Sequence, residues 1–225
     1  MKDQQQYDLK VFVRLKPKQR DVKKNYVTIT QMSNFKQITL KDPFHLETGD
    51  THMFLFDNVF TEDSSQVNIY DDTCKSLYET LMKGKNAGII TYGNSKTGKT
   101  YTLFGEQNLI YERNKIDITQ KTDPRGILAR FAHKLFTEAS NNSLEIEAKV
   151  SFYELSLEQI RDMTRELPEG LMNKRVNEEK IENSVYEKED LLLIDKGNKC
   201  FVKGANEVIA TSAEDIIEIY ESGVF

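Results

Sequence analysis

Hydrophobic and polar side chains alternate along the first part of the chain, in the pattern of strands that bury one face. In the stretch LKVFVRLK, residues 9–16, the apolar face is formed by Leu9, Val11, Val13 and Leu15. Pro17 ends this predicted strand, because proline cannot donate a hydrogen bond to a neighbouring strand. Weaker strand patterns follow at residues 26–30, 37–40 and 54–60. The opening of the chain is therefore predicted to be rich in β-structure.

The spacing of apolar residues changes to that of an amphipathic helix over residues 64–84. Ser64 or Ser65 can cap this helix, and Gly84 can end it. An apolar run at residues 87–92 then leads directly into a glycine-rich stretch. We predict a strand, a loop and a second helix in this order.

Elements of both kinds follow in the second half of the chain. Helical spacing at residues 126–136 precedes the longest period-two run of the sequence, residues 144–152. Short strand patterns lie around a turn at residues 201–204 and 207–210. The last predicted helix begins at Ser212, and Asp215 forms a capping box with it. This mixture of strands and helices indicates an α/β protein.

Two polar stretches separate the predicted elements. Residues 106–123 lack a hydrophobic pattern and read as a surface loop. Residues 164–190 are highly charged, a composition that favours a solvated insertion over a packed element. We therefore expect a single domain over residues 1–225, interrupted by these two segments.

Composition narrows the class of protein. The chain has 225 residues, of which 38% are hydrophobic and 30% charged, as in soluble globular proteins. No apolar run is long enough to cross a bilayer, and the start lacks a secretory signal, so we expect a cytoplasmic protein without a membrane partner. The net charge of −5 argues against a nucleic-acid partner. Cys74 and Cys200 lack metal-ligand spacing, so neither a zinc site nor a disulfide framework is expected.

The glycine-rich stretch GNSKTGKT fits the phosphate-loop pattern G-x-x-x-x-G-K-[ST]. Its residues are Gly93, Asn94, Ser95, Lys96, Thr97, Gly98, Lys99 and Thr100. The glycines let the backbone curl so that its N–H groups point at phosphate oxygens. Lys99 would reach the terminal phosphates, and the Thr100 hydroxyl would ligate Mg²⁺. The sequence therefore predicts a nucleotide site.

Two downstream segments could supply the further groups that nucleotide hydrolysis requires. An apolar run at residues 191–194 ends in Asp195, as would a strand that carries a metal-side aspartate. Asp123 and Gly126 have the D-x-x-G spacing of a γ-phosphate sensor. We favour structural roles for both segments, because Asp195 can end a short strand before a turn and Pro124 can begin a helix.

Several segments, taken in order, match one family. They read VFVRLKP, FDNVF with SSQVNIY, ITYGNSKTGKTYTLFG, RGILARFAHKLF, VSFYELSLEQIRDM and FVKGANEVIATSAEDIIEIYESG. With these segments the chain resembles the motor domain of kinesins. The resemblance runs from Leu9 to Gly223, apart from the loop after Glu106 and the charged insertion.

The resemblance implies a P-loop NTPase fold with a central, mainly β-sheet flanked by helices. It implies that Arg14 and Pro17 flank the adenine of ATP or ADP, with Tyr101 near the ring. Residues 93–100 would hold the phosphates with Mg²⁺. The implied partner is the microtubule, through tubulin, and the implied location is the cytoskeleton.

The chain departs from the family pattern at several positions. Lys16 replaces the second arginine of R-x-R-P, Asn94 replaces a glutamine, and Lys96 replaces a small residue of the phosphate loop. Leu157 stands where the family has asparagine. None of these changes removes Lys99 or Thr100.

Two family segments, the switches N-x-x-S-S-R-S-H and D-L-A-G-x-E, are absent from the sequence. In the family they position the attacking water and sense the γ-phosphate. We therefore expect this chain to bind ATP without hydrolysing it efficiently, and we assign it no catalytic residue. The central sheet would lack strands, so we expect further chain or a second polypeptide to complete it, and residues 1–225 not to fold alone.

Two other functions stay open from the sequence. The chain could be a non-motor subunit, derived from a kinesin and kept as a scaffold in a microtubule assembly such as the axoneme of a cilium. It could also be an unrelated P-loop NTPase that uses Asp195 as its second carboxylate.

Overall fold

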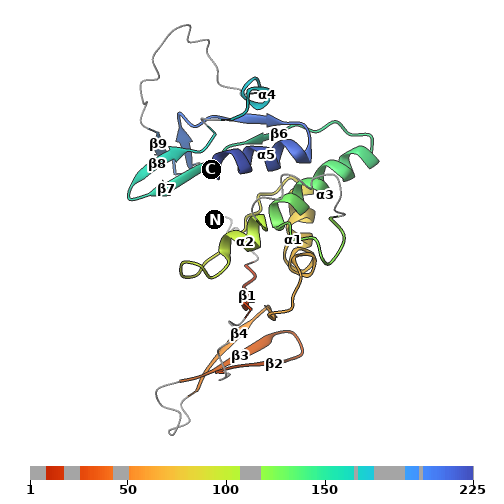
Figure 1. The fold of residues 1–225 in the computed structure, drawn as a ribbon, viewed down its shortest axis with the longest axis vertical. Helices are drawn as coiled ribbons and strands as arrows, with labels where there is room; N and C mark the ends of the chain where they lie inside the picture. The colour runs from red at the N-terminus through yellow and green to blue at the C-terminus, as the bar shows by residue number, and fades with distance from the viewer. Residues whose placement is uncertain are drawn as a thin grey trace, which may run out of the picture. The chain divides into compact units, whose positions relative to one another are not determined.

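The computed structural model describes residues 9–17, 26–42, 51–106, 118–164, 167–174, 191–197 and 200–224. These residues belong to two compact units, Met1–Ile127 and Leu128–Phe225, which we describe separately (Figure 1). Each unit contains strands and helices, so the predicted α/β class is confirmed. The single domain expected from the sequence stays a prediction.

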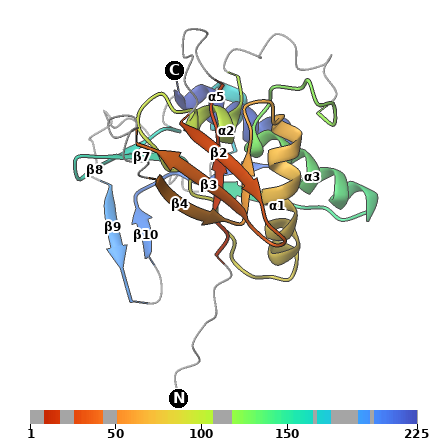
Figure 2. The ribbon, with the colours of Figure 1, turned by 90° about the horizontal axis from the view of Figure 1, so that it is seen from below.

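In the first unit, the residues that the structure describes form a two-stranded sheet and a three-stranded sheet. Its strands are β1 (Phe12–Arg14), β2 (Val27–Gln31), β3 (Lys36–Lys41), β4 (Thr51–Phe56) and β5 (Asn58–Phe60). β1 and β5 pair in parallel, whereas β2, β3 and β4 form an antiparallel sheet in that order, which Figure 2 shows face-on. Strands therefore form at the four predicted positions, but the first is limited to residues 12–14, and the run at residues 54–60 is divided between β4 and β5, which belong to different sheets.

The inward face of β1 differs from the predicted one. Leu9 and Val11 are 82% and 46% exposed, so they do not form an apolar face. Phe12 instead stacks on Phe60, with 6.1 Å between ring centroids. The aromatic ring buries more apolar surface than either aliphatic side chain, which explains the choice of face. Because alternate residues of a strand share a face, Arg14 lies on the same side as Phe12.

Helices α1 (Gln66–Met82) and α2 (Lys99–Phe104) belong to the first unit. Ser65 caps α1, since its Oγ accepts a hydrogen bond from Asn68 N at 3.2 Å. Gly84 follows the end of α1 with a left-handed φ of 73°, a conformation that favours glycine. The predicted start and end of this helix are therefore confirmed.

The core of the first unit lies where β5 and α1 meet Ile127, the first residue of helix α3 (Ile127–Asn141). Its buried residues are Phe60, Ile69, Cys74 and Ile127, with Phe12, Tyr70 and Leu103 packed against them. Burial raises the pKa of the Cys74 thiol to about 11. Cys74 is therefore a neutral apolar contact of this core rather than a reactive thiol.

The strand predicted at residues 87–92 does not form, and residues 85–93 have no regular secondary structure. Ile90 is 93% exposed and Tyr92 is 99% exposed. No strand in the described part of the chain pairs with this segment. A lone strand lacks the ladder hydrogen bonds that would stabilise it, which explains why the prediction is wrong here.

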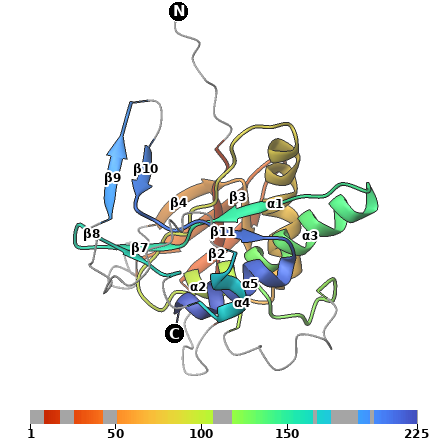
Figure 3. The same cartoon turned by 90° about the horizontal axis from the view of Figure 1, so that it is seen from above.

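The described residues of the second unit form three antiparallel strand pairs. Its strands are β6 (Ala148–Val150), β7 (Tyr153–Ser156), β8 (Gln159–Asp162), β9 (Leu192–Asp195), β10 (Cys200–Lys203) and β11 (Val208–Ala210). β7 pairs with β8, β9 pairs with β10, and the long predicted run at residues 144–152 is reduced to the short strand β6, paired with β11 (Figure 3). Leu144 is 57% exposed, so the first part of that run has no core to face.

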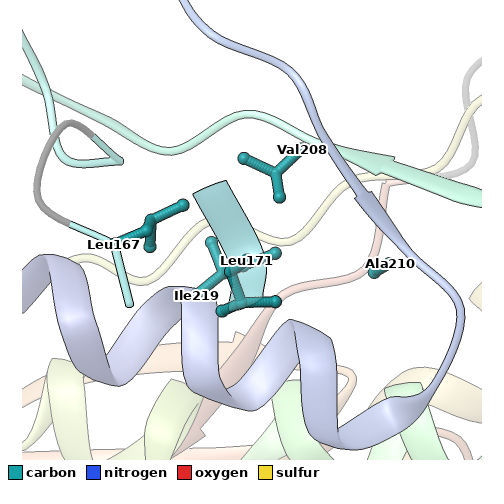
Figure 4. Packing of buried hydrophobic residues seen from close by; sticks show 5 residues of the cluster. All are labelled: Leu167, Leu171, Val208, Ala210 and Ile219. Carbon is teal, nitrogen blue, oxygen red and sulfur yellow. The ribbon is translucent and has the colours of Figure 1, made fainter. Parts of the chain in front are cut away.

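Helices α3 (Ile127–Asn141), α4 (Glu169–Met172) and α5 (Ala213–Val224) accompany these strands. The core of the unit consists of Leu167, Leu171, Val208, Ala210 and Ile219, which converge between α4, α5 and β11 (Figure 4). None of the helices in the described ranges is long and apolar enough to cross a membrane.

The charged insertion predicted at residues 164–190 is packed at its beginning. Leu167 and Leu171 are 4% and 3% exposed, so a solvated segment is the wrong description of this part. Leu171 lies in α4, and Leu167 lies two positions before this helix begins, so the surrounding charges conceal both buried leucines in the sequence. Residues 175–190, and residues 107–117 of the predicted surface loop, lie outside the described residues.

Ser212 caps α5 as predicted, because its Oγ accepts a hydrogen bond from Asp215 N at 3.1 Å. Asp215 Oδ2 accepts hydrogen bonds from Lys174 Nζ at 2.7 Å and Thr211 N at 2.8 Å. Burial alone would raise the pKa of Asp215, but these hydrogen bonds outweigh it and hold the pKa below its ordinary value. The Asp215 carboxylate therefore stabilises the start of α5 only while it is ionised.

We expect Asp215→Asn to lower the free energy of unfolding of the second unit by about 1 kcal/mol at pH 7. A depressed carboxyl pKa gives stability that is present above the unfolded pKa and is lost as pH falls through the folded pKa. The difference between wild type and variant should therefore shrink between pH 5 and pH 3, as followed by denaturant unfolding. A difference that stays constant down to pH 3 would contradict this assignment.

Candidate nucleotide-binding site

The loop of residues 93–100 adopts backbone conformations that its sequence permits. Gly93 and Gly98 have φ values of 153° and 103°, which disfavour residues with a Cβ atom. A Cβ atom at Gly93 would also lie 2.8 Å from Thr97 Oγ1. Lys96 has a φ of 64°, so one non-glycine residue takes the left-handed conformation as well. The curled loop predicted from the glycine spacing is therefore present.

Side chains of the loop turn back onto its own carbonyl groups. Thr97 Oγ1 donates a hydrogen bond to Asn94 O at 2.8 Å. Lys99 Nζ donates to Gly93 O at 2.9 Å and to Asn94 O at 2.8 Å. These contacts hold the lysine ammonium group across the loop, where an anionic phosphate would be a stronger acceptor than a carbonyl.

The residues present fit a phosphate group accompanied by Mg²⁺. Helix α2 begins at Lys99, so the last two residues of the loop lie in its first turn, where Thr100 is exposed. The described residues contain no cluster of three or more acidic, His or Cys side chains that could hold a metal by itself. Mg²⁺ is commonly held by one or two protein ligands together with substrate phosphates and water. Thr100 is therefore a suitable ligand for a metal that arrives with the nucleotide.

Arg14 and Tyr101 lie against each other beside the loop. The Arg14 guanidinium carbon is 5.0 Å from the centroid of the Tyr101 ring. Arg14 Nη1 donates to Thr102 Oγ1 at 2.9 Å, and Thr102 Oγ1 in turn donates to Gly98 O at 2.9 Å. Burial lowers the pKa of Arg14, although an arginine stays charged at neutral pH. The structure thus brings together two of the three residues that the resemblance assigns to the adenine, Arg14 and Tyr101.

The segment after β1 reaches the phosphate loop through Lys16. Its Nζ donates a hydrogen bond to Lys96 O at 2.8 Å. The two cationic departures from the family pattern, Lys16 and Lys96, are therefore in contact, through a backbone carbonyl. Pro17 follows as an exposed residue beyond the end of β1.

Gln66 is a residue of this site that the sequence interpretation missed. It is 4% exposed, and its Oε1 accepts a hydrogen bond from Arg14 Nη1 at 3.0 Å. Its Nε2 donates to Tyr101 O at 2.7 Å and to Pro124 O at 3.3 Å. The available signal was a glutamine at the first position of a helix, within the SSQVNIY segment that matches the family.

The two alternative carboxylates have structural contacts. Asp123 has a fully buried side chain, and its Oδ2 is 2.6 Å from Arg125 Nη2. Asp195 is exposed at the end of β9, in the second unit, where its Oδ1 accepts from Gly197 N at 2.7 Å. These contacts favour the structural interpretation of both residues, as a turn that precedes a helix and as the end of a hairpin strand.

Comparison with known proteins identifies the family of this chain. The model of the kinesin motor domain family matches residues 14–224. The kinesin heavy chain of Drosophila melanogaster is 30% identical over 173 residues, which are 76% of this chain and 15% of that protein. The kinesin-like protein KIP1 of Saccharomyces cerevisiae is 26% identical over 220 residues, 96% of this chain and 19% of that protein.

The kinesin-like protein KIF27 of Mus musculus is 28% identical over 218 residues, 96% of this chain and 13% of that protein. The chain therefore spans no more than 19% of the length of any of these three relatives. The family match nevertheless extends over almost all of this chain, including the phosphate loop and Arg14. The resemblance inferred from the motifs is thereby confirmed, and the chain belongs to the kinesin motor domain family.

Proposed function

We propose that this chain forms the Mg·ATP-binding part of a motor domain that acts on microtubules. The observation that carries the proposal is the juxtaposition of the phosphate loop with Arg14 and Tyr101. The loop offers curled backbone and the Lys99 ammonium group to phosphates, and the Arg14–Tyr101 pair offers a flat cationic and aromatic surface to a base.

Within this proposal each residue of the site has a role. Lys99 contacts the terminal phosphates, and Thr100 ligates the Mg²⁺ that ATP or ADP brings. Gly93, Asn94, Ser95, Lys96, Thr97 and Gly98 surround the phosphates. Arg14, Pro17 and Tyr101 hold the adenine, with Lys16 fixing the loop from the same side.

Completion of the site by another segment is part of the proposal. The apolar residues 87–92 lead into the phosphate loop but pair with no described strand, and Ile90 and Tyr92 are almost fully exposed. We infer that strands from elsewhere in the protein, or from a second polypeptide, pair with this segment. Efficient hydrolysis then depends on groups that those additional segments supply.

The alternative functions fare differently. Membership of the kinesin family contradicts the interpretation as an unrelated P-loop NTPase that uses Asp195. A non-motor scaffold in a microtubule assembly, such as an axoneme, stays a distinct proposal because family membership alone does not require nucleotide binding. Retention of Lys99 and of the loop geometry favours the nucleotide-binding function over a scaffold.

Equilibrium binding of labelled ATP to the full-length protein tests the proposed function. We expect saturable binding of one ATP per chain in the presence of Mg²⁺ and much weaker binding when EDTA removes the metal. Excess unlabelled ADP should displace the label, because it has the same base and two of the phosphates. A full-length protein that shows no Mg²⁺-dependent binding would support the scaffold and overturn the proposal.

A further inference from the structure

We propose that Gln66 is the positioning residue that holds Arg14 against Tyr101 and thereby sets the affinity of the site for the base of a nucleotide. This inference rests on the proposed function, because it concerns the base-binding side of the same site. It adds a residue that does not belong to the phosphate loop and that need not touch the phosphates.

The hydrogen bonds of Gln66 use both ends of its side chain. A carboxamide has one carbonyl oxygen and two N–H donors. The oxygen accepts from Arg14 Nη1 at 3.0 Å, and the nitrogen donates to Tyr101 O at 2.7 Å and Pro124 O at 3.3 Å. Gln66 is thus bonded to three separate parts of the first unit, which leaves its side chain a single orientation.

Two of these contacts lie on the base-binding pair itself. Gln66 holds the side chain of Arg14 and the backbone of Tyr101, so it fixes the two groups relative to each other. With both anchors present, the Arg14 guanidinium carbon lies 5.0 Å from the Tyr101 ring centroid. Without Gln66, Arg14 would keep its contacts with Thr102 Oγ1 and Tyr101 but would lose the hydrogen bond that ties it to the start of α1.

Gln66 is uncharged, and this affects how much of the Arg14 charge is available to a ligand. Its amide accepts a hydrogen bond from Arg14 without neutralising the guanidinium charge, which stays available to an electron-rich base or a phosphate. Glutamate at this position would pair with Arg14 as an ion. It would also lack the N–H groups that bond to Tyr101 O and Pro124 O.

Gln66 should therefore raise the affinity for a nucleotide, which has a base, without raising the affinity for a triphosphate that has none. We expect Gln66→Met, which has a similar shape, to weaken binding of Mg·ATP about tenfold in the full-length protein. Binding of magnesium tripolyphosphate, which reports on the phosphate loop alone, should change less than twofold. The ratio of the affinity for ATP to the affinity for tripolyphosphate should therefore fall in Gln66→Met. It should also fall in Gln66→Glu.

Asn68→Ala is the matched control. Asn68 lies in the first turn of the same helix and caps it with Ser65. Its replacement should lower the stability of α1 and leave the affinity ratio unchanged, whereas a purely structural role of Gln66 would lower both affinities together.

The outcomes separate this inference from the proposed function. If the wild-type protein binds ATP and the ratio of ATP to tripolyphosphate affinity is unchanged in Gln66→Met and Gln66→Glu, the role of Gln66 is overturned. The proposed function then stands. Should Gln66→Met fail to fold, the ratio measured for Gln66→Glu decides the question. A wild-type protein that binds neither ATP nor tripolyphosphate would overturn both.

Discussion

Replacing Lys99 with alanine is expected to weaken Mg·ATP binding by about a hundredfold, as for the loss of charge-assisted hydrogen bonds to phosphate. The fold should tolerate this change, because Gly93 O and Asn94 O, which accept from Lys99 Nζ, belong to exposed residues and can bond to water. Isothermal titration calorimetry of the full-length protein measures the affinity. The same samples give the free energy of unfolding.

Lys85→Ala is a suitable control for Lys99→Ala. It removes a lysine that also lies in the first unit but precedes the phosphate loop by eight positions in the sequence, so it should leave ATP affinity within about twofold. Wild-type affinity in Lys99→Ala would show that the loop does not hold phosphates in the proposed way. A loss of equal size in Lys85→Ala would point to general electrostatic attraction.

The second large effect is expected at Gly126. A Cβ atom there would lie 2.5 Å from Gly105 N and from the carbonyl carbon and oxygen of Leu103. All of these are backbone atoms, so the clash cannot be relieved by rotating a side chain. We expect Gly126→Ala to lower the free energy of unfolding of the first unit by about 3 kcal/mol or more.

Hydrogen exchange of the α1 amides reads the stability of the first unit without assuming that the whole chain unfolds in one step. Faster exchange in Gly126→Ala is the expected result. Gly88→Ala is the control, because its Cβ atom would meet nothing within 4 Å. Equal protection of α1 in the two variants would show that the contact between Gly105 and Gly126 can relax at little cost.

Elements with a local cause could be predicted from the sequence. The cap at Ser65 and the cap at Ser212 depend on residues three positions away, so the pattern contains both partners. The strands β2, β3 and β4 follow one another along the chain, and neighbouring segments therefore supply their hydrogen bonds.

Features that depend on distant residues could not be predicted in the same way. The face of β1 is decided by Phe60, and burial of Leu167 and Leu171 is decided by a core that includes Ile219. The apolar run at residues 87–92 has a strand pattern, but a strand needs a neighbour that the pattern does not contain.

In the site, too, contiguous residues could be predicted from the sequence, and residues with distant partners could not. The phosphate loop is a contiguous segment whose glycine spacing reflects its own backbone, so its residues could be named from the sequence. Arg14 and Tyr101 were assigned only through a family resemblance, and Gln66 was missed. Its partners Arg14, Tyr101 and Pro124 are 52, 35 and 58 positions away, and no spacing rule connects them.

The exposed segment before the phosphate loop, residues 87–92, also affects the tendency of the protein to aggregate. Unpaired backbone groups beside apolar side chains such as Ile90 and Tyr92 can pair with another copy of the same segment. Such self-association leads to aggregates rather than to a finished sheet. The strands that we propose to pair with residues 87–92 would therefore also protect this segment from aggregation.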